Sequence, residues 1–217
     1  MAQRGSVGKC SLCSRAFDAS VMTRHLKACA KAAAGPKAAT CFHLVVEGGW
    51  GREYWLHLAV PVESPFSGID YFLRNIWLEC CGHMSAFRIA GESYSRSPLD
   101  SEEFDMGVAL KRVLKIGMKF WYEYDFGSTT ELQLKVAGVR EFPVERKHPV
   151  LLLARNDPPE VRCEQCGQAR AERICSDCQW SGKGWLCAAC ARKHRCESDY
   201  LLPVVNSPRA GVCGYTG

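Results

Sequence analysis

The sequence predicts an α+β protein with a mixed, mainly antiparallel sheet and two helices, flanked at both ends by small zinc-stapled modules. Three observations lead to this prediction. Short apolar stretches separated by turn residues fill the middle of the chain, as in hairpins. Two other stretches there repeat their apolar residues with a helical period. Cysteine pairs with the spacing C-x-x-C lie near both ends, and that spacing is typical of zinc ligands.

Residues 41–157 form the only segment long enough to bury a conventional core. Within it, residues 41–46 and 54–60 are rich in apolar and β-branched side chains, and Gly48–Gly49 separates them as a turn, so they are expected to pair as a hairpin. Further strands are expected at 84–90, 119–126, 132–136 and 150–153. Antiparallel hairpins with helices between them are typical of an α+β domain.

Two helices are expected in this segment. Pro65 occupies the first position of one helix, whose apolar residues keep a helical period to about Glu79, and Gly82 ends it. The second helix is expected from about Phe104 to Lys115, where apolar residues again recur at helical spacing.

The N-terminal motif has the spacing C-x2-C-x11-H-x3-C of a C2HC zinc finger, within a module at residues 1–32. Its four expected ligands are Cys10, Cys13, His25 and Cys29. Phe17 and Met22 stand where a ββα finger has its apolar core residues. On a helix, His25 and Cys29 are four residues apart and share one face, so both can bind one zinc ion.

The same region is strongly basic. Residues 1–40 contain seven Lys or Arg and one Asp, so any attraction to DNA or RNA is expected there. The candidate phosphate-contacting residues are Arg15, Arg24, Lys27 and Lys31. A solvated basic helix without a nucleic-acid partner is the alternative. Residues 33–40 are rich in Ala, Gly and Pro and are expected to be a linker, which predicts a tethered, mobile finger.

The densest motif is CEQCGQARAERICSDCQWSGKGWLCAACARKHRC, within an expected C-terminal module at residues 158–217. Its eight candidate ligands are Cys163, Cys166, Cys175, Cys178, Cys187, Cys190, His194 and Cys196. Eight ligands predict two tetrahedral zinc ions. The regular spacing suits a cross-brace, in which pairs one and three hold one ion and pairs two and four the other, and sequential pairing is the alternative.

Three zinc ions are therefore expected in all. The formal net charge is +5, but thiolate ligands and zinc ions together bring the molecule close to neutral. A disulfide framework is the alternative use of so many cysteines. The N-terminus lacks an apolar signal-peptide segment, and no long apolar run predicts a membrane span, so a cytoplasmic protein with zinc sites is expected.

The tail at residues 201–217 is apolar and too rich in Gly and Pro for a helix, so it is expected to lie across the core or the zinc module. Arg209 is expected to form a salt bridge with the acidic core. Cys213 is an alternative to Cys196 as a zinc ligand.

Three stretches carry a resemblance: YFLRNIWLECCGHMSAFRI, KFWYEYDFGSTTELQLKV and the ending NSPRAGVCGYTG. They resemble the plasmid pRiA4b ORF-3-like family, of the insertion-element passenger type, over roughly residues 41–155. The resemblance implies a mobile-element protein. Ser128, Thr130 and Leu132 stand where many members have Asp, Trp and His. The C-terminal module resembles the MYND and B-box cross-braces, which implies a protein-binding role.

The candidate site for catalysis lies near Cys80, Cys81, His83 and Asp125. A cysteine beside an imidazole can act as a nucleophile with its base, or can bind a metal together with Cys213. A position at a helix C-terminus disfavours a thiolate, however, and a packed helix end is the simpler interpretation. For Asp125 the simpler interpretation is a turn carboxylate that accepts backbone N–H bonds.

The leading hypothesis is a non-enzymatic, zinc-dependent accessory protein of mobile-element type. It is expected to contact nucleic acid through residues 1–40 and a protein partner through the C-terminal zinc module. The alternatives are an enzyme with a site in the central domain and a pure protein adaptor.

Overall fold

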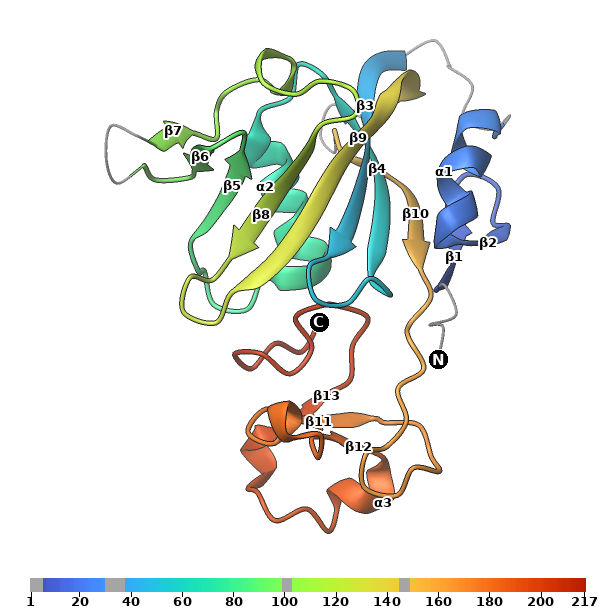
Figure 1. Cartoon of the computed structure of the whole chain (residues 1–217), viewed down its shortest axis with the longest axis vertical. Helices are drawn as coiled ribbons and strands as arrows, with labels where there is room; N and C mark the ends of the chain where they lie inside the picture. Colours follow the sequence, from blue (N-terminus) through green and yellow to red (C-terminus); the bar gives the residue numbers. More distant parts are fainter. Residues whose placement is uncertain (1–5, 30–37, 99–102, 145–148) are drawn as a thin grey trace.

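The computed structural model describes residues 6–29, 38–98, 103–144 and 149–217 and shows an α+β protein with two sheets (Figure 1). The large sheet has the strand order β2-β1-β10-β4-β3-β9-β8-β5-β6-β7, and the small sheet β12-β11-β13. All described pairings between these strands are antiparallel except β6 with β7. The predicted fold class, a mainly antiparallel sheet with few helices, is confirmed.

The strands of the large sheet are β1 (Val7–Cys10), β2 (Ala16–Asp18), β3 (Ala38–Gly48), β4 (Trp55–Pro61), β5 (Ser85–Ile89), β6 (Glu92–Ser95), β7 (Glu103–Asp105), β8 (Lys119–Tyr124), β9 (Thr130–Pro143) and β10 (Leu151–Asn156). Those of the small sheet are β11 (Arg173–Cys175), β12 (Trp185–Leu186) and β13 (Leu201–Pro203). The α-helices are α1 (Ala19–Ala28), α2 (Phe66–Leu73) and α3 (Ala188–Ala191). A π-helical turn, Arg74–Leu78, continues α2, and 3-10 turns lie at Leu110–Arg112, Gln179–Ser181 and Ser198–Tyr200.

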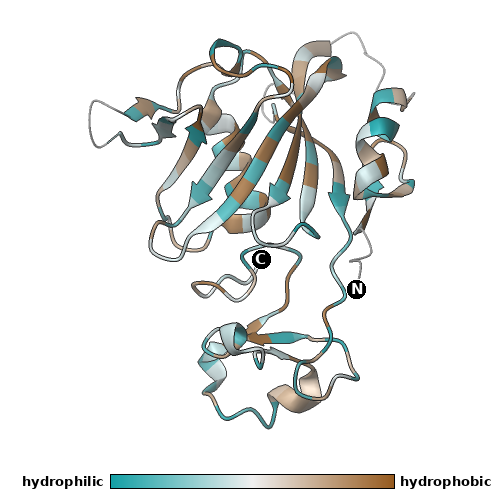
Figure 2. Cartoon of the chain, in the orientation of Figure 1, coloured by the Kyte–Doolittle hydropathy of each residue, from teal (hydrophilic) through white to brown (hydrophobic). Residues whose placement is uncertain are grey.

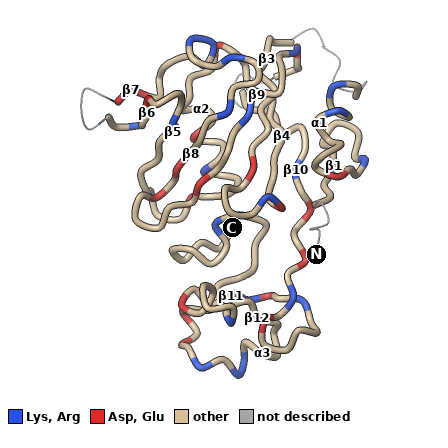
Figure 3. Tube along the Cα trace, in the orientation of Figure 1, with Lys and Arg blue, Asp and Glu red and all other residues tan. Residues whose placement is uncertain are grey.

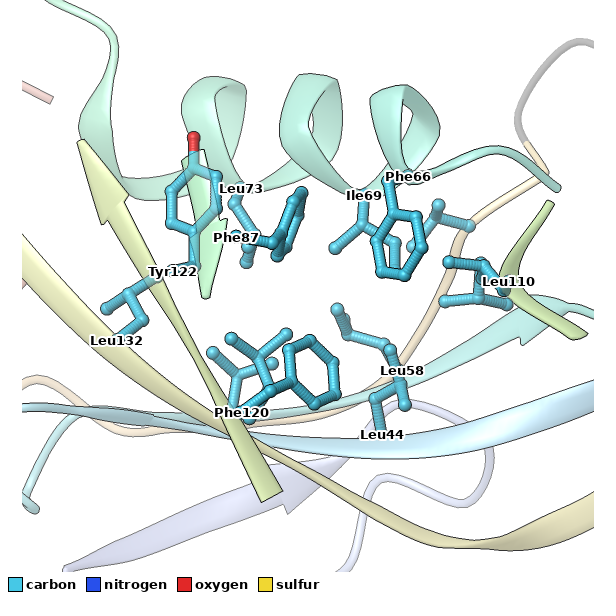
Figure 4. Close-up of a cluster of buried hydrophobic side chains, with 14 of the residues drawn as sticks. Leu44, Leu58, Phe66, Ile69, Leu73, Phe87, Leu110, Phe120, Tyr122 and Leu132 are labelled. Carbon is cyan, nitrogen blue, oxygen red and sulfur yellow. The ribbon is translucent and has the colours of Figure 1, made fainter. Parts of the chain in front are cut away.

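The main core lies between α2 and one face of the large sheet (Figure 4). Phe66, Ile69 and Leu73 point from the helix into the sheet and are fully buried. Phe87 on β5 packs against Phe66 and against Tyr122 on β8, with ring centroids 5.2 and 4.8 Å apart. Each such side chain contributes about 1.5–3 kcal/mol on burial, which is why this helix holds its place on the sheet.

The strand patterns give this sheet one apolar face. The predicted hairpin forms between β3 and β4, with Val45 opposite His57. Along β8 and β9, residues of opposite hydropathy alternate (Figure 2). Phe120, Tyr122 and Tyr124 point inward as predicted, whereas Phe126 lies beyond the strand and is half-exposed. Alternation with period two therefore identified the buried face of these strands.

The helix predicted at 104–115 is wrong. Its first residues form β7, which pairs with β6, and the Asp105 carboxylate then accepts the N–H of Gly107 at 2.6 Å in a tight turn. Further along, the N–H of Leu110 donates to the Ser64 carbonyl oxygen at 2.9 Å instead of to a helical carbonyl. Leu110 and Leu114 are still buried in the core, so these apolar residues reach it without forming a helix.

The N-terminal unit of β1, β2 and α1 is part of the large sheet. Strand β1 pairs with β10, and Gly8 lies opposite Asn156. The indole N–H of Trp55 on β4 donates to the Ser6 hydroxyl at 2.6 Å, and its ring is buried beneath the unit. The expectation of a mobile unit is therefore wrong, because strand pairing and shared apolar packing hold it in place. Residues 38–40 of the expected linker lie in β3.

None of the helices in the described part of the chain is long and apolar enough to span a membrane.

Two buried histidines lie side by side beneath the N-terminal unit. Nε2 of His43 and Nδ1 of His57 are 2.9 Å apart, so one ring donates to the other. Burial lowers the pKa of His43 to about 4, helped by the charge of Arg140, and lowers that of His57 to about 3. Both rings are therefore neutral in the folded protein, and their folded pKa values lie below the ordinary value of about 6.5.

We expect the free energy of unfolding to fall as the pH falls from about 6.5 toward 4, because the unfolded chain binds more protons in that window. Each histidine contributes a slope of up to about 1.4 kcal/mol per pH unit. A His43→Gln variant should show a shallower slope than the wild type in denaturant unfolding with zinc held in excess. Parallel slopes in the two proteins would contradict this account.

Docking of the N-terminal unit can be tested at Gly8. A Cβ atom there would overlap the Arg155 carbonyl oxygen and lie 2.6 Å from a ring carbon of Trp55. We expect Gly8→Ala to destabilise the β1–β10 pairing by roughly 1–3 kcal/mol, measured as faster hydrogen exchange of the β1 amides. Gly138→Ala in β9 is the matched control, because its Cβ would meet nothing within 4 Å. Equal exchange in the two variants would count against a docked unit.

Candidate metal centres

Four groups of cysteine and histidine side chains could each hold a metal ion in the described part of the chain. In every group the four ligand atoms lie within 4.8 Å of one another. The groups are Cys10–Cys13–His25–Cys29, Cys163–Cys166–Cys187–Cys190, Cys175–Cys178–His194–Cys196 and Cys80–Cys81–His83–Cys213. The first three gather all twelve metal ligands predicted from the sequence, and the fourth is a group outside that prediction.

The N-terminal group joins the end of β1 to the helix α1. Cys10 ends β1, Cys13 follows in the turn, and its Sγ lies 3.4 Å from Nε2 of His25. The ring of Phe17 stacks on His25 with centroids 4.0 Å apart, which fixes the orientation of the imidazole. Met22 on the inner face of α1 is fully buried, as the ββα pattern predicted. The local fold thus aims four ligands at one point.

The eight C-terminal ligands separate into two interleaved groups. Sγ of Cys166 lies 3.9 Å from Sγ of Cys187, and Sγ of Cys178 lies 3.5 Å from Sγ of Cys196. Pairs one and three therefore meet, as do pairs two and four. This grouping results from the small sheet, in which β11 pairs with both β12 and β13. The pairing brings the first and third ligand pairs to one end of β11 and the second and fourth pairs to its other end. This grouping of the ligand pairs matches a cross-brace and differs from sequential pairing.

Donor chemistry fits a metal at these groups. In a tetrahedral zinc site with bonds of about 2.3 Å, two sulfur atoms are roughly 3.8 Å apart, close to the separations above. Nε2 of His194 is buried and has no hydrogen-bond partner in the described structure, as expected of a nitrogen atom that binds a metal. Thiolate-rich sets of four ligands favour zinc or iron–sulfur centres over harder cations.

Backbone N–H groups favour the thiolate form at two ligands. The N–H of Arg15 points at Sγ of Cys13 and lowers its pKa to about 6. Burial raises the pKa of Cys163, but the N–H groups of Cys187 and Cys166 outweigh it and the value is lowered to about 6. The thiolate is the form that binds metal, so these two turns favour binding at Cys13 and Cys163, whereas burial raises the pKa of Cys10 to about 11.

The fourth group joins the central domain to the C-terminal tail. Cys80, Cys81 and His83 follow the π-helical turn, and Cys213 comes from the tail. Sγ of Cys81 lies 2.9 Å from Nε2 of His83 and 3.8 Å from Sγ of Cys213. The sequence raised this combination only as one alternative, because no local spacing connects a Cys-Cys-x-His stretch with a cysteine 130 residues away from the histidine. Cys213 does not join the group of Cys196.

Asp125 lies beside the fourth group, and its carboxylate accepts three hydrogen bonds. Its Oδ2 accepts from Arg209 at 2.6 Å, and its Oδ1 accepts the N–H groups of Gly127 and Ser128. Burial alone would raise the pKa of Asp125, but Arg209 and these N–H groups hold it below the ordinary value. The expected salt bridge of Arg209 and the turn role of Asp125 are both present. A carboxylate held in this way is poorly suited to act as a general base.

Three of the four candidate nucleic-acid contacts belong to the N-terminal unit, where Figure 3 marks Lys and Arg positions along α1. Arg15, Arg24 and Lys27 are exposed, and the guanidinium of Arg15 lies 5.6 Å from the centre of the Phe17 ring. Lys31 lies outside the described residues. Asp18 is the only acidic residue between positions 6 and 29.

A pocket of about 580 Å³, which the sequence analysis missed, lies between the large sheet and the small one. Its walls include Trp50 from the β3–β4 turn, Trp180 and Trp185 from the C-terminal module, and Pro208 and Val212 from the tail. Trp50 is 88% exposed and Trp180 82% exposed. Composition carries no signal for this gathering of tryptophans.

Comparison with protein families matches residues 48–174 to the family described as "Plasmid pRiA4b ORF-3-like protein". Comparison with curated proteins gives no match. Among solved structures, a protein of unknown function from Methanosarcina mazei Go1 is similar with 14% sequence identity and a TM-score of 0.43. The similarity covers 47% of this chain and 61% of that one, so the chain spans less than two thirds of the length of that protein.

The interleaved pairing predicts the metal content of two double variants. Cys166 and Cys190 belong to one group, whereas Cys166 and Cys178 belong to different groups. We expect Cys166→Ser with Cys190→Ser to lower the metal content by one ion per chain, and Cys166→Ser with Cys178→Ser to lower it by two, measured by elemental analysis of purified protein. Sequential pairing gives the reverse order, so that result would reject the cross-brace. Cys41→Ala, which replaces a cysteine that belongs to none of the groups, is the control.

Proposed function

We propose that this chain, which belongs to the plasmid pRiA4b ORF-3-like family, is a zinc-stabilised, non-enzymatic accessory protein that binds nucleic acid. Its N-terminal unit contacts phosphates, and its C-terminal module contacts a protein partner. The plasmid association of the family supports a role with mobile DNA. The observation that carries the proposal is that the three predicted groups each supply four protein ligands.

Four protein ligands complete the tetrahedral shell of zinc. Catalytic zinc sites keep one position open for water or substrate, whereas structural sites are closed. The N-terminal group and one C-terminal group have three cysteines and one histidine, and the other C-terminal group has four cysteines. All three compositions are those of closed, structural zinc sites. Zinc in them stabilises the surfaces on which they lie, and those surfaces carry the function.

The N-terminal surface has the charge that a phosphate backbone requires. Met22 and Leu26 face the sheet, so the opposite side of α1 is free and presents Arg24 and Lys27, with Arg15 on the adjoining turn. Asp18 is the only carboxylate between positions 6 and 29, one negative charge against these three positive ones. Such a surface binds the backbone of DNA or RNA without selecting a sequence. Because the unit is fixed to the sheet, it presents these charges in a constant arrangement.

Pure protein binding is the second candidate, favoured by the exposed Trp50 and Trp180. Large aromatic residues are enriched in the centres of protein interfaces, and these two line the same pocket. The C-terminal module is therefore the surface proposed for a protein partner. Catalysis is less well supported, because Asp125 is held by Arg209 and two backbone N–H groups.

The proposal predicts that binding depends on three basic side chains. Replacing Arg15, Arg24 and Lys27 with Gln should weaken binding of labelled duplex and single-stranded DNA and RNA, measured by fluorescence anisotropy of the zinc-loaded protein. If each residue neutralises one phosphate, the slope of log K against log salt concentration should become shallower by about 2–3. Charge substitution is preferable to deletion of residues 1–40, which would uncover the buried Trp55.

The matched control replaces Arg112, Lys115 and Lys119 with Gln. These residues are also exposed, and replacing them removes the same amount of positive charge from the central domain. The control should bind as the wild type does. Equal losses in both triple variants would mean that only net charge matters and would reject the N-terminal surface. Absence of binding by the wild type would favour the protein adaptor and its tryptophan-lined pocket.

A further inference from the structure

We propose that Cys80, Cys81, His83 and Cys213 form a fourth zinc site, which fastens the C-terminal tail to the central domain. The four ligand atoms come from two segments far apart in the sequence and lie within 4.8 Å of one another. This site is separate from the three predicted ones. It adds a function to the tail, because the metal would hold the end of the chain against the core.

The sulfur positions match a tetrahedral ion. Sγ of Cys81 lies 3.7 Å from that of Cys80 and 3.8 Å from that of Cys213, and two sulfur ligands of one zinc ion are roughly 3.8 Å apart. Nε2 of His83 lies 2.9 and 3.2 Å from Sγ of Cys81 and Cys213. These distances are shorter than the roughly 3.6 Å between sulfur and nitrogen ligands of zinc, so the ring moves outward slightly on loading.

The backbone is shaped to bring these ligands together. Gly82, between Cys81 and His83, has φ of +80°, a value that glycine adopts without strain. The N–H of Gly82 donates to the Glu79 carboxylate at 2.6 Å, which fixes the turn. Cys213 itself has φ of +50°, an uncommon conformation for a residue with a side chain. Such conformations persist where the surroundings require them, as a metal ligand would.

Two further side chains orient the ligands. Nδ1 of His83 faces Oδ1 of Asp125 at 3.5 Å, and its Nε2 faces the other ligands. A carboxylate on the far nitrogen of a ligating histidine is a common feature of zinc sites, because it holds the ring and its tautomer in place. Arg209 donates to Sγ of Cys80 at 3.5 Å while it also pairs with Asp125, so it connects Cys80 with the carboxylate that faces His83. The site therefore has two neighbouring charged side chains, Asp125 and Arg209, that contact its ligands.

Two other uses of these residues fit less well. A disulfide between Cys81 and Cys213 would leave His83 and Cys80 without a role, and the sulfur atoms are 3.8 Å apart. A nucleophile with His83 as its base requires neither Cys213 nor the contact of Arg209 with Cys80. Zinc uses all four ligands. Cys41 is then the only one of the fourteen cysteines outside a metal group.

The site has a structural consequence for the pocket between the sheets. Pro208, Ala210 and Val212 of the tail form one of its walls and lie close in sequence to Cys213. Between them, Arg209 is fully buried against the core. Loss of the metal would leave the tail, and with it this wall, held to the core only by Arg209 and the packing of its neighbours. Cys81 and Cys213 are exposed, so this ion is also the one most accessible to a chelator.

The first test is the zinc content of the full-length protein. We expect four ions per chain in the wild type and three in Cys81→Ser, in Cys213→Ser and in the double variant, because both residues serve one site. Cys41→Ala should keep four. The side chain of Cys213 is exposed, so its variant tests the site even if Cys81→Ser does not fold. Three ions in the wild type, unchanged in the variants, would overturn the proposal.

Two further measurements use the same proteins. All fourteen thiols should react after chelation and denaturation without reductant, whereas twelve would indicate a disulfide and overturn the zinc assignment. Trypsin should cleave after Arg209 faster in Cys213→Ser than in the wild type or Cys41→Ala, since release of the tail exposes this buried arginine. Equal cleavage in the three proteins would overturn the fastening role.

Discussion

The buried ion pair between Arg209 and Asp125 is the contact on which the arrangement of the molecule depends. Arg209 comes from the C-terminal tail and is fully buried, and Asp125 follows β8 in the central sheet. The same guanidinium donates to Thr130 and to Cys80. Removing one partner of a buried ion pair typically costs about 3–5 kcal/mol, because the other charge is left unpaired. Together with the proposed zinc site, this contact holds the docked tail, the pocket wall and Cys213 in place.

The two ends of the chain use their metal groups differently. The N-terminal unit shares an apolar cluster with Trp55 and Leu153 of the large sheet, so it has packing and strand pairing besides its ligands. The C-terminal module has a much smaller cluster, built around Leu186 and two of its own cysteines. So small a core cannot offset the entropy of folding without metal. Metal loss should therefore affect the C-terminal module most.

Much of the central fold followed from sequence because its strands obey one rule. Alternating residues such as Phe120 and Tyr122 had to face a core, and the hairpin of β3 and β4 needed only a nearby turn. The predicted second helix failed because Leu110 and Leu114 can reach a core from a turn as well as from a helix. Apolar spacing reports burial and does not by itself report the backbone hydrogen bonds that achieve it.

By itself, the sequence determined the metal-ligand pairs, since a C-x-x-C turn brings two thiolates together through local geometry. Tertiary structure decided which pairs come together in one group of candidate ligands, because strand pairing in the small sheet sets their distances. It alone brought Cys213 to Cys81 and placed the N-terminal unit on β10. These contacts join residues far apart in the chain, and they depend on how the whole chain packs.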